Sequence, residues 1–374
     1  MKKKRWLALA LSSMLLLPAS VHAGAPANYR LGWSGGGLES GGSAMIKNGV
    51  TYLDAMGIGG SAGLTVQADA SGSRIQFDGW DKHFAIRIGS RTGMLDGKLT
   101  DLGAVVIKQG EHVYVPARFL VHALEGGTVS WDAKNNLIMA NGLHFFKQYS
   151  QTFEGSTYSV NVENGELFVT KGTGEPRRLA SLGPYADLLS MQFAKTKGGL
   201  LVLTVNNNYG EPHINHQTLT LVLKNGSLIR VSDVKYWKRW EQNVTQYGDQ
   251  LLLTDGRTLR LIQDGTGAVT QTIDLVKLGG EDDSYFIEAF DKDFLLIRPN
   301  QKGLLTLIDR ATGASTLLYK KLLTAEEQDY AENNDVPYYG DQLKYMKRED
   351  STLYFVNNAD DPSKPEYTYT LRGA

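Results

Sequence analysis

The sequence contains no cysteine. This absence excludes disulfide bonds, thiolate metal sites and cysteine nucleophiles. It also excludes the type of lipid anchor that requires an acylated cysteine after a leader peptide. Without cross-links, stability must come from buried apolar area. A chain of 374 residues can bury enough, and its length is typical of about two domains.

Long apolar runs are also missing, apart from one short run near the N-terminus. Residues 2–5 are basic, residues 6–17 are mostly apolar, and small side chains lead up to Ala23. This pattern predicts a signal peptide over residues 1–23. The apolar run is shorter than the roughly 20 residues that a membrane-spanning helix needs. We therefore expect a secreted or cell-surface protein with no transmembrane segment after cleavage.

An excess of positive charge is missing as well. Loss of residues 2–5 would change the formal charge from −1 to about −5. Binding to nucleic acid requires clustered cations, so a mildly acidic chain is a poor candidate for it. The C-terminal residues include no apolar span, so we expect any retention at the surface to be non-covalent. The sequence does not indicate an oligomeric state.

Residues 24–44 are rich in glycine and serine and contain few apolar side chains to bury. Such a composition is typical of flexible tethers. We predict a flexible linker here.

The most informative run is residues 113–132, which predicts a strand, a helix and the first strand of a hairpin. Pro116 suits the first helical turn because its missing N–H would be unpaired there anyway. Phe119 and Leu124 fall on one helical face, and Gly126-Gly127 can supply a left-handed cap. Residues 50–69 align with this run and indicate a duplication. That first copy has several glycines at about 1 kcal/mol each relative to alanine, so we expect it to be degenerate or differently folded.

This run resembles the stalk module at the N-terminus of some copper amine oxidases. The module also recurs in exported Gram-positive proteins that are not oxidases. The resemblance covers residues 45–143 and implies a small α+β stalk domain with a mounting role rather than a catalytic one. The motif positions that match are Tyr114, Pro116, Arg118, Phe119, Leu124, Gly127, Trp131 and Asp132.

The rest of the chain, residues 145–374, consists of short apolar segments separated by turn residues. Asn225-Gly226 between two alternating segments is the strongest short-range hairpin signal. A buried-type strand recurs at intervals whose mean is close to the about 40–45 residues of a propeller blade. We predict a mainly β fold with a β-propeller-like domain of about five blades; four or six blades, or an irregular sandwich, are the alternatives. A strand near Tyr158 could close the ring beside residues 367–370.

Two local signals refine this picture. Thr324 and Glu327 form a capping-box pattern that predicts a short helix inserted among the strands. The resemblance also prompts a test for copper chemistry: glycine follows Tyr209 where the oxidases have an acidic residue. His213 and His216 are three positions apart and would not share a strand face. We therefore predict no cofactor and no metal site.

Carboxylates offer the best enzymatic alternative, a propeller-type carbohydrate-active hydrolase or lyase at the cell wall. Two carboxyl groups about 5–9 Å apart would suffice for glycoside hydrolysis. Most candidates lie in turn sequences, where aspartate is common because it binds the local backbone. The candidates are Glu166, Asp187, Asp255, Asp291 and Asp309.

One aromatic and basic cluster stands out: Trp237, Lys238, Arg239 and Trp240. Flat aromatic rings can stack on sugars or cations, and the two basic residues would attract acidic polymers. The alternative is that these large side chains pack against a blade. The reading favoured by the whole sequence is an exported, non-enzymatic binding or scaffold protein of the cell envelope. Its expected partner is a cell-wall polymer or an envelope protein, and not nucleic acid.

Overall fold

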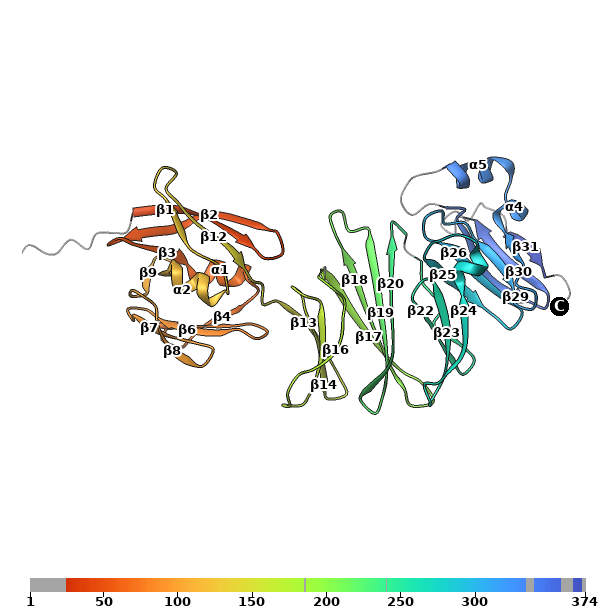
Figure 1. Ribbon diagram of the computed structural model, residues 1–374, viewed down its shortest axis with the longest axis horizontal. Helices are drawn as coiled ribbons and strands as arrows, with labels where there is room; N and C mark the ends of the chain where they lie inside the picture. The colour runs from red at the N-terminus through yellow and green to blue at the C-terminus, as the bar shows by residue number, and fades with distance from the viewer. Residues whose placement is uncertain (1–24, 185, 240, 334–339, 358–365, 372–374) are drawn as a thin grey trace, which may run out of the picture. The chain divides into compact units, whose positions relative to one another are not determined.

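The computed structural model describes residues 25–184, 186–239, 241–333, 340–357 and 366–371 (Figure 1). The predicted signal peptide, residues 1–23, lies outside the described residues. The chain divides into two compact units, Met1–Phe145 and Phe146–Ala374, which we call the N-terminal and C-terminal units.

The described residues of the N-terminal unit, 25–145, form two sheets and two short helices, which lie between the sheets (Figure 1). The seven-stranded sheet has the order β11-β12-β1-β2-β3-β10-β9, and the five-stranded sheet runs from β4 to β8 in chain order. Both helices contact β3 and β10. The bounds are β1 (Ala25–Trp33), β2 (Leu38–Lys47), β3 (Val50–Asp54), α1 (Ala55–Ser61), β4 (Thr65–Ala68), β5 (Arg74–Asp78), β6 (His83–Arg87), β7 (Thr92–Leu95), β8 (Lys98–Asp101), β9 (Ile107–Gln109), β10 (His112–Pro116), α2 (Ala117–Ala123), β11 (Ser130–Asp132) and β12 (Leu137–Leu143).

The predicted flexible linker over residues 24–44 is wrong. Its residues form β1 and most of β2, and β1 lies between β12 and β2 in the large sheet. Leu31 of β1 is fully buried. Gly41 of β2 faces Tyr29, and a Cβ atom there would lie 2.6 Å from the tyrosine hydroxyl. Glycine in this segment therefore allows close packing between strands, a role that composition does not distinguish from flexibility.

The structure also shows the duplication and corrects the expectation for its first copy. In each copy a strand leads directly into a helix, and β3 and β10 pair antiparallel. The first copy forms helix α1 despite its glycines. Gly59 of this helix faces the ring of Phe77, and a Cβ atom there would lie 2.7 Å from that ring. Tertiary packing thus outweighs the low helix propensity of glycine.

The two adjacent helical glycines of α1 give a matched prediction. A Cβ atom at Gly60 would meet nothing within 4 Å, so Gly60→Ala is expected to raise the free energy of unfolding by about 0.5–1 kcal/mol. Gly59→Ala is expected to lower it, because displacing the Phe77 ring costs about 1–3 kcal/mol. Urea unfolding of both variants provides the measurement. Equal stabilisation by the two substitutions would show that α1 and Phe77 are not closely packed.

The predicted cap of the second helix is shifted by one residue. The left-handed residue after α2 is Glu125, with φ of 57°, and not a glycine. Glu125 and Gly126 donate backbone hydrogen bonds to His122 and Val121, which is the pattern of a Schellman motif. A Cβ atom at Gly126 would lie 2.8 Å from Val121, so this glycine serves close packing. The Glu125 carboxylate lies 2.8 Å from the buried ammonium of Lys82, an ion pair that accompanies the unusual conformation.

The structure also locates the remaining positions of the stalk motif. Tyr114, Phe119 and Leu124 are buried, whereas Arg118 is exposed. Pro116 ends β10 and precedes the first helical residue. The other three positions lie in or before the last hairpin: Gly127 donates to the Asn141 carbonyl, Trp131 is partly exposed in β11, and Asp132 accepts from the backbone of the following turn.

The C-terminal unit is a series of five antiparallel sheets in chain order, which we call sheets 1 to 5 (Figure 1). Sheets 1 to 4 have four strands each, and three strands of sheet 5 are described. Sheet 1 comprises β13 (Gln148–Phe153), β14 (Ser156–Asn161), β15 (Glu166–Lys171) and β16 (Arg177–Ser181); sheet 2 comprises β17 (Leu188–Lys195), β18 (Leu201–Tyr209), β19 (Asn215–Lys224) and β20 (Ser227–Trp237); sheet 3 comprises β21 (Gln246–Tyr247), β22 (Gln250–Thr254), β23 (Thr258–Gln263) and β24 (Val269–Asp274). Sheet 4 comprises β25 (Tyr285–Phe290), β26 (Phe294–Pro299), β27 (Thr306–Asp309) and β28 (Ser315–Leu317), and sheet 5 comprises β29 (Leu343–Glu349), β30 (Thr352–Asn357) and β31 (Glu366–Thr370).

Hydrophobic clusters connect each of these sheets to the next one in the chain. One cluster is shared by sheets 1 and 2, and others by sheets 2 and 3, 3 and 4, and 4 and 5. Among the described residues of this unit, three helices accompany the strands: α3 (Leu275–Gly279), α4 (Tyr319–Leu322) and α5 (Ala325–Asn333). The architecture is therefore mainly β and propeller-like, with five repeated sheets.

Local signals in this unit are confirmed, but the proposed ring closure is wrong. Asn225-Gly226 joins β19 to β20 with positive φ at both residues, as a type I′ turn requires. Thr324 and Glu327 exchange the hydrogen bonds of a capping box before α5. However, β14 pairs with β13 and β15, and β31 pairs with β30. Within the described residues, sheets 1 and 5 are not joined by strand pairing.

Candidate functional site

The aromatic and basic segment lies at the end of β20, where it emerges from sheet 2. Trp237 is the last residue of the strand, pairs with Asn215 of β19, and is 50% exposed. Lys238 adopts a left-handed conformation with φ of 60° and donates its backbone N–H to the Ile214 carbonyl. Its ammonium lies 4.2 Å from the centre of the Trp237 ring. The two residues therefore present an aromatic face and a cation together at the surface.

Arg239 has a different role, because its side chain is buried. Its Nε donates to the Asn300 carbonyl at 2.5 Å, and its Nη2 donates to the Gln301 carbonyl at 3.0 Å. Gly303 lies against this guanidinium, and a Cβ atom there would overlap it. Burial, together with the nearby charge of Arg298, lowers the pKa of Arg239. The structure thus places Arg239 beneath the surface segment, where it holds β20 to the loop after β26; Trp240 lies outside the described residues.

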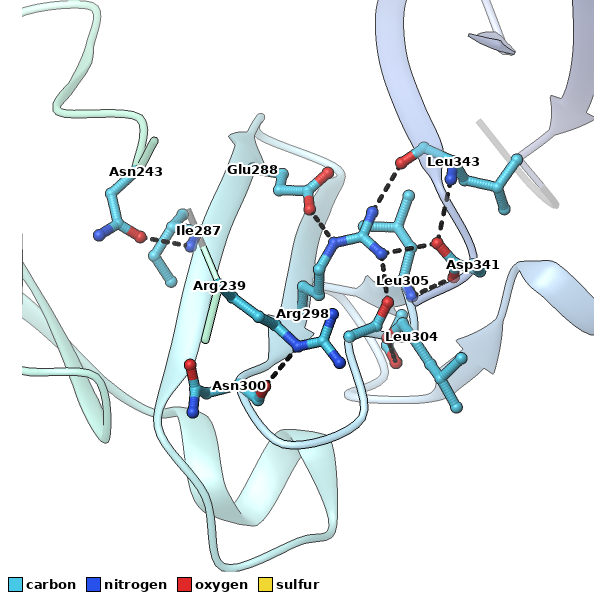
Figure 2. Close-up of polar contacts among 12 residues, drawn as sticks. Arg239, Asn243, Ile287, Glu288, Arg298, Asn300, Leu304, Leu305, Asp341 and Leu343 are labelled. Carbon is cyan, nitrogen blue, oxygen red and sulfur yellow. Dashed lines mark hydrogen bonds and ion pairs between the residues drawn. The ribbon is translucent and has the colours of Figure 1, made fainter. Parts of the chain in front are cut away.

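Behind Arg239 lies a buried network of charged side chains (Figure 2). Arg298 of β26 forms an ion pair with Glu288 of β25, and its Nη1 lies 2.6 Å from Asp341. The side chains of Arg298 and Asp341 are only 4% and 0% exposed. Nη1 also donates to the Gly303 carbonyl, and Nη2 donates to the Leu343 carbonyl. Asp341 in turn accepts from the backbone N–H groups of Leu305 and Leu343.

The electrostatics of this network depend on the balance between burial and pairing. Burial raises the pKa of Glu288, although Arg298 acts in the opposite direction. Burial also opposes the charged form of Arg298, but Asp341 and Glu288 outweigh it and raise the pKa of that guanidinium. Arg298 is therefore charged and connects sheet 4 to the start of sheet 5. Through Gly303 and Arg239 the same network reaches the end of β20 in sheet 2.

None of the sequence patterns described above pointed to this network. Its signal is nonetheless present: Glu288 and Arg298 are single opposite charges in two consecutive apolar segments, residues 285–290 and 294–299. Charged residues are almost never fully buried unless they are paired, so two such interruptions indicate an ion pair. Asp341 has no comparable signal, because it lies in a polar connection more than forty positions away.

The carboxylates considered for catalysis have partners of their own. Glu166 pairs with Arg178 at 2.8 Å, Asp187 with His213 at 3.0 Å, and Asp291 with Arg348 at 2.7 Å. Asp255 and Asp309 accept backbone N–H groups in turns. These contacts agree with the turn interpretation of those aspartates.

His213 and His216 have different surroundings. His213 precedes β19 and binds Asp187, whereas His216 lies within the strand, where burial lowers its pKa. In the part of the chain that the structure describes, no group of three or more histidine, aspartate or glutamate side chains is arranged to hold a metal ion. None of the described helices is both long enough and apolar enough to span a membrane.

Comparison with known proteins supports the resemblance of the N-terminal unit. Residues 35–139 match the family model of the copper amine oxidase N-terminal domain. A sequence search of curated proteins gives no match.

Solved structures resemble the chain only distantly. Dihydro-heme d1 dehydrogenase NirN aligns at 9% identity with a TM-score of 0.24, over 67% of this chain and 56% of its own length. Sqt1 of Saccharomyces cerevisiae aligns at 10% identity and a TM-score of 0.28, over 93% of this chain and 96% of its own. AztD of Citrobacter koseri aligns at 11% identity and a TM-score of 0.26, over 83% and 86%.

Proposed function

We propose that this chain is an exported, non-enzymatic binding or scaffold protein at the cell envelope of a Gram-positive bacterium. The N-terminal unit mounts the protein on the envelope, and the C-terminal unit presents a binding surface. The partner is a cell-wall polymer or an envelope protein.

The observation that carries this proposal is the surface segment at the end of β20. Trp237 is half exposed with Lys238 over its ring, while Arg239 fixes the same segment to a buried charge network. An exposed aromatic side chain on a rigid support favours recognition, because little conformational entropy is lost when a ligand binds. The ion pairs and turn contacts of the candidate carboxylates favour binding over hydrolysis.

Co-sedimentation with purified cell-wall sacculi tests the mounting role. The chain starting at residue 25 is compared with residues 146–374 alone. If both units contact the wall, removing the N-terminal unit should weaken binding by about 100-fold or more, because linked sites gain that much from effective concentration.

Two other outcomes have definite meanings. If the full chain stays in the supernatant, the protein is not mounted on the wall. If residues 146–374 sediment as well as the full chain does, the N-terminal unit is not the attachment module. Circular dichroism of both proteins controls for loss of folding.

A further inference from the structure

Sheet 5 has an edge that sheets 1 to 4 do not have. In each of those four sheets the third strand pairs on both sides, because a fourth strand lies outside it. The third strand of sheet 5 is β31, and in the part of the chain that the structure describes it pairs with β30 only. The position that corresponds to a fourth strand therefore lies open beside β31 among the described residues.

The backbone groups that point into this position belong to every second residue of β31. The Leu371 N–H donates to the Ser351 carbonyl in the turn before β30. In an antiparallel pair, opposed residues exchange hydrogen bonds at alternate positions. Tyr367 and Tyr369 share the parity of Leu371, so their backbone groups face β30. The residues whose N–H and C=O groups face away from β30 are Glu366, Thr368 and Thr370.

This edge lacks the protection seen on another sheet. In sheet 2 the outer edge of β20 is occupied, because Arg260 donates to the Val231 carbonyl and the Asn300 side chain accepts from the Trp237 N–H. No described residue makes a comparable hydrogen bond to the outward groups of β31. The strand also contains neither lysine nor proline, the residues that commonly protect an edge. An unprotected edge of this kind is a template for a further strand.

The side chains of β31 indicate what kind of strand fits. Tyr367 and Tyr369 pack against the hydrophobic cluster that includes residues of sheet 4 and α4, and both are only partly buried. Glu366, Thr368 and Thr370 are exposed on the opposite face. A strand added at this edge should therefore continue the same alternation of aromatic and polar side chains. β31 itself has that alternation.

We propose that β31 is a dimerisation edge, where two copies of this chain pair antiparallel about a twofold axis at Thr368. In this register Thr368 opposes its own equivalent, Glu366 opposes Thr370, and Tyr367 opposes Tyr369. Every opposed pair of outward-facing residues exchanges two hydrogen bonds. The tyrosines meet at the closer, non-hydrogen-bonded positions, and aromatic and threonine cross-strand pairs are both favourable.

The same geometry disfavours other registers. A shift by one residue would oppose the outward groups of one copy to residues whose backbone groups already bond to β30. A shift by two residues would leave Glu366 or Thr370 without an opposed residue in β31. In the proposed register the two Glu366 carboxylates lie four residues apart along the strands, or about 14 Å, so no like charges are opposed. The inference goes beyond the proposed function, because it does not depend on what the protein binds.

Sedimentation velocity of the chain from residue 25 tests the dimer, at concentrations up to about 0.5 mM because small interfaces are weak. The wild type is expected to show a monomer–dimer equilibrium. Thr368→Pro removes an N–H that faces away from β30, so the monomer should keep its fold while the dimer is lost. Thr368→Lys places like charges opposite each other and should weaken association by about tenfold or more. Thr65→Lys, at an exposed threonine of the edge strand β4, is the matched control and should change nothing.

Two further measurements separate a lost interface from a lost fold. An equimolar mixture of Thr368→Lys and Thr368→Glu should dimerise again, because the opposed charges then attract, whereas misfolded variants would not recover. Hydrogen exchange of the Thr368 amide should slow as the concentration of the wild type rises, while the Tyr369 amide is protected at every concentration.

The remaining outcomes would overturn the proposal. A wild type that stays monomeric at the highest concentration has no dimerisation edge. If it is monomeric and its Thr368 amide nevertheless exchanges slowly, another segment of the same chain occupies the edge. Dimers that persist in both Thr368 variants, or that disappear in Thr65→Lys, place the interface elsewhere.

Discussion

Replacing Arg298 with methionine is expected to cost the C-terminal unit about 3–5 kcal/mol of unfolding free energy. The substitution keeps most of the side-chain volume but leaves Glu288 and the fully buried Asp341 without their shared cation. It also removes the donors to the Gly303 and Leu343 carbonyls. Urea unfolding measures the loss of free energy. Hydrogen exchange of the backbone amides in β25, β26 and β29 measures it locally.

The pH dependence identifies the cause of this loss. Burial holds the pKa of Glu288 above its ordinary value of 4.5 even beside Arg298. The methionine variant loses the charge and the hydrogen bond by which Arg298 lowers this pKa. A carboxyl group whose pKa is higher in the folded protein takes up protons on folding, so stability falls as pH rises through that range. The deficit of the variant relative to the wild type should be largest above the raised pKa and should shrink toward pH 4.5 and below. A deficit independent of pH would mean that lost packing, and not buried charge, destabilises the variant.

An exposed ion pair in the same unit provides the control. Arg178 pairs with Glu166 in sheet 1, and their side chains are 56% and 34% exposed. Arg178→Met is therefore expected to change stability by only about 0–1 kcal/mol. The variant that combines Arg298→Met with Glu288→Gln should recover part of the lost stability. In this variant the Glu288 charge is removed together with its partner Arg298.

The second large effect is expected in the N-terminal unit, where Phe77→Ala should cost about 3–5 kcal/mol. Phe77 of β5 is fully buried and stacks on Phe84 with ring centres 4.3 Å apart. Phe84 in turn meets the edge of Phe119 from α2. The substitution would open a cavity where the five-stranded sheet packs against both helices.

Thermal unfolding with hydrogen exchange in each unit measures this loss. Leu99 lies in the same sheet and is 76% exposed, so Leu99→Ala should stay within about 0.5 kcal/mol of the wild type. The C-terminal unit should retain its own protection in the Phe77→Ala variant. Equal loss of protection in both units would show that they unfold as one.

Where the sequence carries a signal of local geometry, it predicts the fold well. The Asn225-Gly226 hairpin, the helix after Thr324 and the strand-helix order around Pro116 depend on neighbouring residues only. Repetition of such signals is enough to predict five consecutive sheets. The interpretation of glycines is less reliable, because Gly41 and Gly59 are needed for close approach to Tyr29 and Phe77, which are distant in sequence or on another strand.

Of the candidate site, too, only a part could be predicted from the sequence. Composition alone singles out Trp237 and Lys238, which are at the surface, but it does not separate them from the buried Arg239. The register of β19 and β20 brings Asn215 beside Trp237, and this neighbour is visible only after folding. The ion pair of Glu288 and Arg298 could have been inferred from isolated charges in apolar segments; its third member, Asp341, could not.

Because β1 is an interior strand of the seven-stranded sheet, it determines which fragments of this protein keep that sheet intact. The segment recognised by family similarity begins at residue 35, after β1 has ended at Trp33. A fragment that starts there would leave the facing sides of β2 and β12 without their shared neighbour, each with a row of unpaired N–H and C=O groups. Open edges of this kind promote edge-to-edge association and aggregation. Recombinant fragments and fusion partners of the N-terminal unit should therefore retain every residue from Ala25 onward, ten residues more than similarity alone would suggest.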